Sequence, residues 1–349
     1  HLSIRRQRQM CIRDSSRIGL GLLSDKLGRK PILMLGLLSG SVASLLCSLS
    51  YSPLPLIVAN IFEGLRWSAY FSNGLALIAD VSSESDRTKS ITAFTLVSSA
   101  GLLIGPAFAS VMLLSVSIRQ LFYFSTALSF AVLFVASSVI PSPRVQKSAT
   151  GVRGSLMAIF KRREILLASW LISLYFFVEV AVFTFIPVFA SEVIGLSESQ
   201  VTLISTLRAS MMTGVRFFVT KLENLAGRKR LLLITSLGFL VSSPLMGISN
   251  SWVQIATFSA IFGAAQGASF PLMMLTVNDA ADSSERGLAN AACLAIGDLA
   301  GAFSPIVMGG AVESLGLTMM FALTGIPIMA LLVSATRLPT PKSGVSSAE

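Results

Sequence analysis

Five charged residues lie near the middle of long apolar stretches, where ions are rarely tolerated: Glu63, Arg66, Glu179, Arg208 and Asp298. At the centre of a lipid bilayer a charge costs at least ~2.5 kcal/mol, so a charged side chain at such a position usually serves a function. The expected functions are binding a polar substrate and carrying a proton. The alternative is that the five ions satisfy one another inside a helical bundle without touching a substrate.

Glu63 and Arg66 are three residues apart. On a helix they share one face, so they can form an ion pair. Tyr70 and Asn73 continue the same face. We therefore predict a polar stripe along this segment and include all four residues among the candidate substrate or proton sites.

A proton carrier must change its charge, which points to the carboxylates, because arginine stays charged at any physiological pH. Arg66 favours the ionised form of nearby Glu63. Glu179 and Asp298 have no base within one helical turn on their own segments, so burial favours their protonated forms. Glu179 is our first choice for the carrier and Asp298 the second, and a contact between Arg208 and Glu179 would favour Asp298.

The segments that carry these ions are apolar and numerous. Of 349 residues, 53% are hydrophobic and only 13% are charged, and the mean hydropathy is +0.76. A helix needs about 20 mostly apolar residues to cross a bilayer. Ten such windows follow one another, at 31–50, 55–79, 90–114, 120–140, 165–189, 200–220, 231–249, 252–277, 287–311 and 317–336. Long continuous runs disfavour a membrane β-barrel, so the sequence predicts an all-α, multi-pass membrane protein.

Basic residues gather in every second gap between these windows, and they give the orientation. The intervening gaps hold a single base, Arg119. The positive-inside rule therefore places the loops around residues 28 and 227, the segment 141–164 and the C-terminus in the cytoplasm of a cell-membrane protein. The net charge of +10 then reflects topology. No basic stretch has the aromatic residues or the module typical of nucleic-acid binding.

The chain repeats itself after 199 positions without a gap. The landmarks that coincide are Gly28 with Gly227, Arg29 with Arg228, Lys30 with Lys229, Gly64 with Gly263, Asp80 with Asp279, Arg87 with Arg286 and Pro106 with Pro305. Two similar sets of spans joined by a polar linker are typical of transporters built from parallel repeats. We predict an N-terminal bundle over 16–140, a cytoplasmic linker over 141–164, a C-terminal bundle over 165–337 and a tail over 338–349.

The segment GLLSDKLGRKPIL, residues 21–33, carries a family resemblance. It is similar to the signature of the major facilitator superfamily between the second and third helices, through Gly21, Leu23, Ser24, Asp25, Lys26, Gly28, Arg29 and Lys30. The resemblance implies two pseudo-symmetric helix bundles, with the ten windows as helices three to twelve. Helix one and most of helix two would then be missing. The resemblance also places the helices with Glu63, Arg66 and Glu179 around a central cavity.

A second segment, GLLIGPAFAS at 101–110, resembles the fifth-helix motif of the family's antiporters through Gly101, Gly105 and Pro106. The chain departs from the motif at its closing glycine pair, which is replaced by Ala109 and Ser110. It departs again in the fourth helix, where the family's arginine is replaced by Asn60, although Arg66 lies further along the same helix.

The loop motif itself has a physical interpretation. Its glycines permit a tight turn where two helices approach, Arg29 and Lys30 favour the anionic inner leaflet, and Asp25 can accept hydrogen bonds or pair with a base. The resemblance implies a latch that forms in one access state and breaks in the other. Because Asn224 replaces Asp25 in the second copy, we expect the latch charge in the first half alone.

The first residues differ in character from everything that follows. Residues 5–15, RRQRQMCIRDS, match the in-frame translation of a transposon sequencing adapter. We interpret residues 1–15 as a library artefact fused to a truncated gene. His1 and Cys11 then drop out of any chemical argument, and Cys47 and Cys293 are small apolar packing residues.

An enzymatic function is not expected. The chain has no histidine beyond His1, no cluster of metal ligands and no phosphate-binding loop, so we predict no metal site and no cofactor. We predict a monomeric, lipid-embedded secondary transporter that exports a small molecule in exchange for protons. The alternatives are a proton-coupled importer of a polar or anionic solute and a transport-inactive sensor or scaffold. A scaffold would not need five ions in the membrane.

Overall fold

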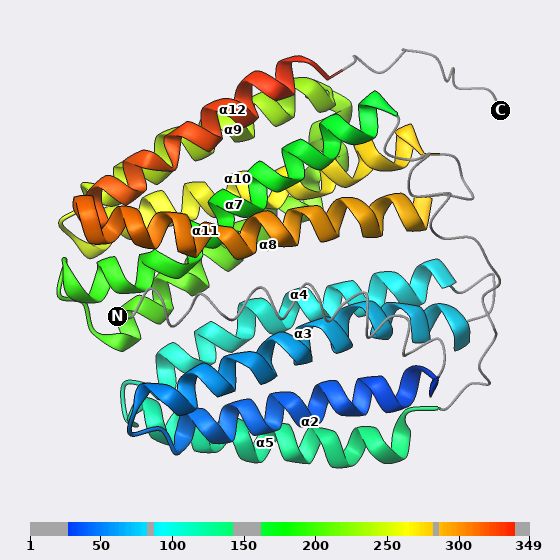
Figure 1. The fold of residues 1–349 in the computed structure, drawn as a ribbon, viewed down its shortest axis with the longest axis vertical. Helices are drawn as coiled ribbons and strands as arrows, with labels where there is room; N and C mark the ends of the chain where they lie inside the picture. Colours follow the sequence, from blue (N-terminus) through cyan, green and yellow to red (C-terminus); the bar gives the residue numbers. More distant parts are fainter. Residues whose placement is uncertain (1–26, 82–86, 142–161, 282–285, 339–349) are drawn as a thin grey trace. The chain divides into compact units, whose positions relative to one another are not determined.

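The computed structural model describes residues 27–81, 87–141, 162–281 and 286–338. Throughout these ranges the regular structure is helical (Figure 1), and the helices are α2 (Arg29–Ser48), α3 (Pro53–Val81), α4 (Arg87–Met112), α5 (Ile118–Val139), α7 (Arg163–Glu192), α8 (Glu198–Ala226), α9 (Arg228–Gly247), α10 (Trp252–Ala280), α11 (Arg286–Leu323) and α12 (Gly325–Thr336). The predicted all-α fold is confirmed.

Each predicted apolar window coincides with helical structure. The boundary between the last two windows falls at Gly316, whose φ of 85° breaks α11 into two helical parts. The window 317–336 therefore covers the second part of α11 together with α12. A glycine tolerates this left-handed backbone because it has no Cβ.

Six segments of the described chain are long and apolar enough to cross a membrane: Arg29–Ser48, Ile118–Val139, Arg163–Glu192, Arg228–Gly247, Trp252–Ala280 and Ala292–Thr336. Two helices outside this set, α3 and α8, contain Glu63, Arg66 and Arg208.

The internal repeat extends to the ends of the helices. A shift of 199 positions places α2 on α9 and α3 on α10 at both ends, and it places the start of α4 on the start of α11. The residues that precede α2 and α9 are Gly28 and Gly227, with φ of 97° and 79°. The predicted glycine turn is therefore present in both copies.

Serine side chains cap the starts of α5, α8 and α10, at Ser117, Ser197 and Ser251. Ser117 Oγ accepts a hydrogen bond from the backbone N–H of Gln120 at 3.3 Å, and Gln120 Oε1 accepts one from the backbone N–H of Ser117 at 2.8 Å. This reciprocal capping box satisfies donors that the first turn of α5 would leave unpaired. At the start of α10, Ser251 Oγ accepts from the Gln254 N–H at 3.4 Å.

The chain divides into two compact units. The first contains the described parts of His1–Gly151 with Leu196–Thr206 and Gly301–Glu313, and the second contains the described parts of Val152–Gly195, Leu207–Ala300 and Ser314–Glu349. In the first unit α2 packs between α3 and α5, and α3 also contacts α4 (Figure 1). In the second unit α9 packs on α10 and α12, while α7 packs on the same two helices.

Candidate functional site

In the first unit, the predicted ion pair on α3 is present. Arg66 Nε donates to Glu63 Oε2 at 2.8 Å, and Arg66 Nη2 donates to Glu63 Oε1. The side chains are 32% and 39% exposed. A two-point contact of this kind fixes the guanidinium and carboxylate planes relative to each other, so these two ions largely satisfy one another.

Small residues on α2 make room for the arginine. A Cβ added to Gly40 would overlap Arg66 Cδ, and one added to Gly36 would meet the Ala69 Cβ at 2.7 Å. The guanidinium also lies 5.3 Å from the centre of the Trp67 ring. Arg66 is therefore held between two helices and an aromatic face.

The remaining residues of the predicted stripe have separate partners. Asn73 is 2% exposed, and its Nδ2 donates to the Ala69 carbonyl of its own helix at 3.0 Å. The Tyr70 ring packs on Phe94 of α4, with ring centres 5.7 Å apart. Asn73 is thus anchored to the backbone, and Tyr70 presents its ring to the neighbouring helix.

In the second unit, Glu179 of α7 meets a partner that the sequence analysis did not predict. Gln266 of α10 donates from Nε2 to Glu179 Oε1 at 3.0 Å and is itself 5% exposed. The signal in the sequence was an amide in the middle of an apolar window, between Gly263 and Gly267. Gln266 holds one carboxylate oxygen by a hydrogen bond to a charged group, a strong kind of contact.

The two glycines that flank Gln266 bring α10 against α8. A Cβ at Gly263 would collide with the Arg208 carbonyl oxygen, and a Cβ at Gly267 would collide with the Met212 carbonyl oxygen. Close backbone approach through glycines four residues apart is typical of membrane helices. Because the two backbones touch at these glycines, Arg208 of α8 has a fixed position relative to Gln266 of α10. Through the hydrogen bond from Gln266, its position relative to Glu179 is fixed as well.

Arg208 lies in the same region as Glu179. Its guanidinium carbon is 5.0 Å from the centre of the Phe183 ring on α7. The arginine interacts electrostatically with Glu179. Its Nη1 is buried and has no hydrogen-bond partner in the part of the chain that the structure describes. Glu179 and Arg208, predicted separately, therefore belong to one cluster.

Aromatic rings surround this cluster. Tyr175, 4% exposed, contacts Phe176, Phe239 and Phe270, with ring centres 5.4, 6.1 and 6.0 Å away. Phe239 packs in turn on Phe262, 4.7 Å away. These rings come from α7, α9 and α10, and they form an apolar wall beside Glu179 and Gln266.

Asp298 is 6% exposed and lies on α11. Its neighbour Gly297 lets α11 approach α7, because a Cβ there would meet Ile172 Cγ2 at 2.6 Å and Phe176 Cδ2 at 3.0 Å. Asn290, two turns earlier, donates to Asn278 Oδ1 of α10 at 2.6 Å. Asp298 is thus a buried carboxylate against the helix that carries Glu179.

Of the loop motif, the structure describes the part from Leu27 onward, which includes its second glycine, Gly28. Gly28 precedes α2, and Arg29 and Lys30 are its first residues. Gly21 and Asp25 lie outside the described residues. The glycines of the fifth-helix motif, Gly101 and Gly105, have no described atom within 4 Å of an added Cβ, and Pro106 lies within α4.

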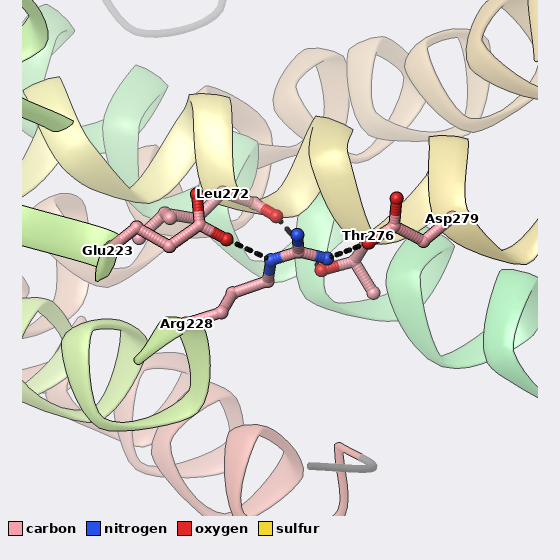
Figure 2. A network of polar contacts seen from close by, with 5 residues as sticks. All are labelled: Glu223, Arg228, Leu272, Thr276 and Asp279. Atoms are coloured by element: carbon pink, nitrogen blue, oxygen red, sulfur yellow. Dashed lines mark hydrogen bonds and ion pairs between the residues drawn. The ribbon is translucent and has the colours of Figure 1, made fainter. Parts of the chain in front are cut away.

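The second copy of the loop corrects the expectation that the latch charge exists in the first half alone. Arg228 Nε donates to Glu223 Oε1 at 2.7 Å, and Arg228 Nη1 donates to Asp279 Oδ2 at 2.6 Å (Figure 2). Glu223, one residue before Asn224, supplies the carboxylate. The expectation was wrong because it considered only the position equivalent to Asp25. The pairs connect the end of α8, the start of α9 and the end of α10.

A further contact lies at the same end of α10. Arg162 Nη1 donates to the carbonyl of Ala280, the last residue of the helix, at 3.0 Å. Thr276, between the two partners of Arg228 in Figure 2, donates to the Leu272 carbonyl of its own helix at 2.9 Å. Arg162 and Arg228 thus donate their hydrogen bonds to carbonyl and carboxylate oxygens of the protein itself. The described residues contain no group of three or more His, Cys, Asp or Glu side chains able to hold a metal ion.

Comparisons with known proteins agree on the family. The model of the Major Facilitator Superfamily matches residues 16–225 and 191–349. The chain is 29% identical over 130 residues to the "Quinolone resistance protein NorA" of Staphylococcus aureus strain MRSA252, covering 37% of this chain and 33% of NorA. It is 21% identical over 245 residues to the "Multidrug resistance protein MdtL" of Klebsiella pneumoniae strain 342, covering 68% of this chain and 61% of MdtL.

The match to NorA thus spans a third of that relative's length. Among solved structures, the human organic anion transporter MFSD10 (TETRAN) matches with a TM-score of 0.69 and 16% identity, over 95% of this chain and 83% of that one. At this identity the likeness concerns the fold. With helices that match the predicted windows, a repeat that extends to the helix ends and a family model that covers nearly all residues from 16 onward, the chain belongs to the major facilitator superfamily, a family of membrane transporters and not of enzymes.

Proposed function

We propose that the protein is a secondary active transporter that exports a small molecule in exchange for protons. The observation that carries the proposal is the cluster of Glu179, Gln266 and Arg208, which combines a half-buried carboxylate, a buried amide and a half-buried cation inside an apolar unit. Ions in such a position mark substrate and proton pathways. Two relatives are named for resistance to quinolones and to multiple drugs, which supports export.

In this proposal Glu179 and Asp298 are the candidate proton carriers. Asp298 is 6% exposed, and Glu179 accepts a hydrogen bond from Gln266 and interacts with the charge of Arg208. A carboxylate in such surroundings can change its protonation state when its access to water changes. Glu63 makes a two-point contact with Arg66, so we assign it a structural role.

The proposal is tested in proteoliposomes that contain the full-length protein. A pH gradient is imposed, and uphill movement of a fluorescent drug is compared for wild type, Glu179→Gln and Asp298→Asn. We expect at least one variant to lose gradient-driven transport. Glu192→Gln, at the exposed end of α7, is the matched control and should transport normally. Unchanged transport by both core variants would show that neither carboxylate carries the proton.

The alternative is a proton-coupled importer of a polar or anionic solute, because the unpartnered Nη1 of Arg208 offers a hydrogen-bond donor to an anion in either direction of transport. The direction of net movement in the same vesicles separates the two functions. A transport-inactive scaffold predicts no movement of any solute.

We also propose that the protein acts as a monomer in the cell membrane, with the segment 141–164 and the C-terminus in the cytoplasm. The alternation of basic loops along the sequence supports this orientation. The first bundle is proposed to end near residue 140, and the second to run over 165–337.

A further inference from the structure

Arg208 has an unused hydrogen-bonding capacity. Its guanidinium keeps its charge at all physiological pH values and offers five N–H donors in a fixed plane. Nη1 is nevertheless buried without a hydrogen-bond partner in the described parts of the chain. Buried polar atoms in native proteins are nearly always hydrogen-bonded, so an exception suggests a partner that binds and leaves.

The arginine cannot easily move away to find water. Its carbonyl oxygen lies against Gly263 of α10, where even one added carbon would not fit, and its Cγ is 3.0 Å from that added carbon. Both the backbone and the first part of the side chain are therefore fixed by α10.

The surroundings indicate what kind of ligand would fit. The guanidinium lies 5.0 Å from the centre of the Phe183 ring, which is 57% exposed. Phe176, one turn from Glu179 on the same helix, is half-buried. Planar anions such as carboxylates match the fork of an arginine, and exposed aromatic rings favour a flat apolar body beside the charge.

We propose that Arg208 binds the carboxylate of an aromatic substrate, with Phe183 packing against the aromatic part. This inference rests on the proposed transport function and names the class of molecule that the cluster around Arg208 recognises. Glu179 then has a second role, because its negative charge interacts with Arg208 and opposes an incoming anion. Neutralising Glu179 should therefore strengthen the binding of the anion.

The test uses equilibrium binding to the purified full-length protein in lipid nanodiscs, without any pH gradient. The probes are 1-naphthoate and its neutral isostere 1-naphthamide. Wild type should bind naphthoate about tenfold more tightly than naphthamide, since tenfold corresponds to one ordinary charge-assisted contact. Arg208→Gln should lose that preference. Glu179→Gln should bind naphthoate more tightly than wild type does, with little change for naphthamide.

Lys221→Gln, an exposed position on the same helix, is the matched control and should keep the wild-type preference. If Arg208→Gln fails to fold, the comparison of the two probes on wild type and on Glu179→Gln still decides. Equal or absent binding of the two probes to wild type overturns the proposal, as does a folded Arg208→Gln that keeps the preference. Because no gradient is applied, binding can succeed even if proton-coupled export is disproved.

Discussion

Gln266 is the residue on which the arrangement of the site most depends. It joins α10 to α7 through the hydrogen bond from its Nε2 to Glu179 Oε1, at 3.0 Å. The side chain is 5% exposed, so water cannot replace the contact. Glu179 would lose its amide partner if Gln266 were apolar.

Replacing Gln266 by leucine should therefore destabilise the folded protein and slow transport. The expected loss of stability is about 1.5–3 kcal/mol, the range for a hydrogen bond to a charged group. Thermal unfolding of purified protein measures it. In a Glu179→Gln background the same substitution should cost clearly less, because the charged acceptor is already gone. Equal losses in the two backgrounds would mean that the hydrogen bond contributes nothing.

At the residue scale the sequence predicted which ions are unusual and which two pair on one helix, but not the contacts between residues of different helices. Glu63 and Arg66 were matched correctly because both lie on one helix, three residues apart. Gln266 was missed because its partner is 87 residues away. Glu223 was missed because the equivalent position in the other copy, Ser24, has no charge. Contacts between helices depend on packing that no local spacing reveals.

At the scale of the elements, the contact between α8 and α10 depends on two glycines. A Cβ at Gly263 would overlap the Arg208 carbonyl oxygen. A backbone carbonyl cannot rotate away from an added Cβ as a side chain can. With alanine at this position, α8 and α10 would therefore have to move apart. The position of Arg208 relative to Gln266 would change with them.

Gly263→Ala should therefore lower the yield and thermal stability of the protein, with a loss of about 1–3 kcal/mol as found for overpacked cores. Gly214→Ala, on α8 where an added Cβ meets nothing within 4 Å, is the control. It should be neutral or stabilising, since alanine is the better helix former by up to ~1 kcal/mol. Loss of stability in Gly214→Ala alone would contradict the proposed role of the α8–α10 contact.

The cluster around Arg228 joins three helix ends, and its contribution should be modest. Arg228 and Glu223 are 16% and 18% exposed, but Asp279 is 62% exposed, so solvent screens that half of the contact. We expect Arg228→Ala to destabilise the protein by about 1 kcal/mol. Arg228→Lys should recover only part of this, because one ammonium lacks the planar fork that reaches both carboxylates. Full recovery by lysine would show that charge alone matters.

Among the features of the helices, the ends that are marked by glycines were the most predictable. Gly28 and Gly227 precede α2 and α9 with positive φ, as expected for glycines at a tight turn. Gly316 divides α11 where the two last apolar windows separate. These features were predictable because they depend on the residue itself and on its immediate neighbours in the sequence.

At the scale of the whole molecule, the alternation of basic loops predicts which ends of the helices face the cytoplasm. A membrane-impermeant maleimide applied to intact cells should label Asn250→Cys, which is exposed before the start of α10. Asn224→Cys, exposed near the end of α8, should react only after the cells are permeabilised. The reverse pattern would invert the proposed topology. The native Cys293 is buried and should remain unlabelled.

The agreement of the helix bounds between the two copies has a consequence for how the molecule arose. α3 and α10 begin and end at equivalent positions, yet Phe262 and Ala265 of α10 stand where α3 has Glu63 and Arg66. After a duplication, selection thus preserved the glycines and the lengths that both copies need, while the polar chemistry diverged. The first copy carries the Glu63–Arg66 ion pair on α3, and the second carries Arg208 on α8, whose Nη1 has no hydrogen-bond partner in the described part of the chain. Ancestral reconstruction should find the scaffold older than the specificity.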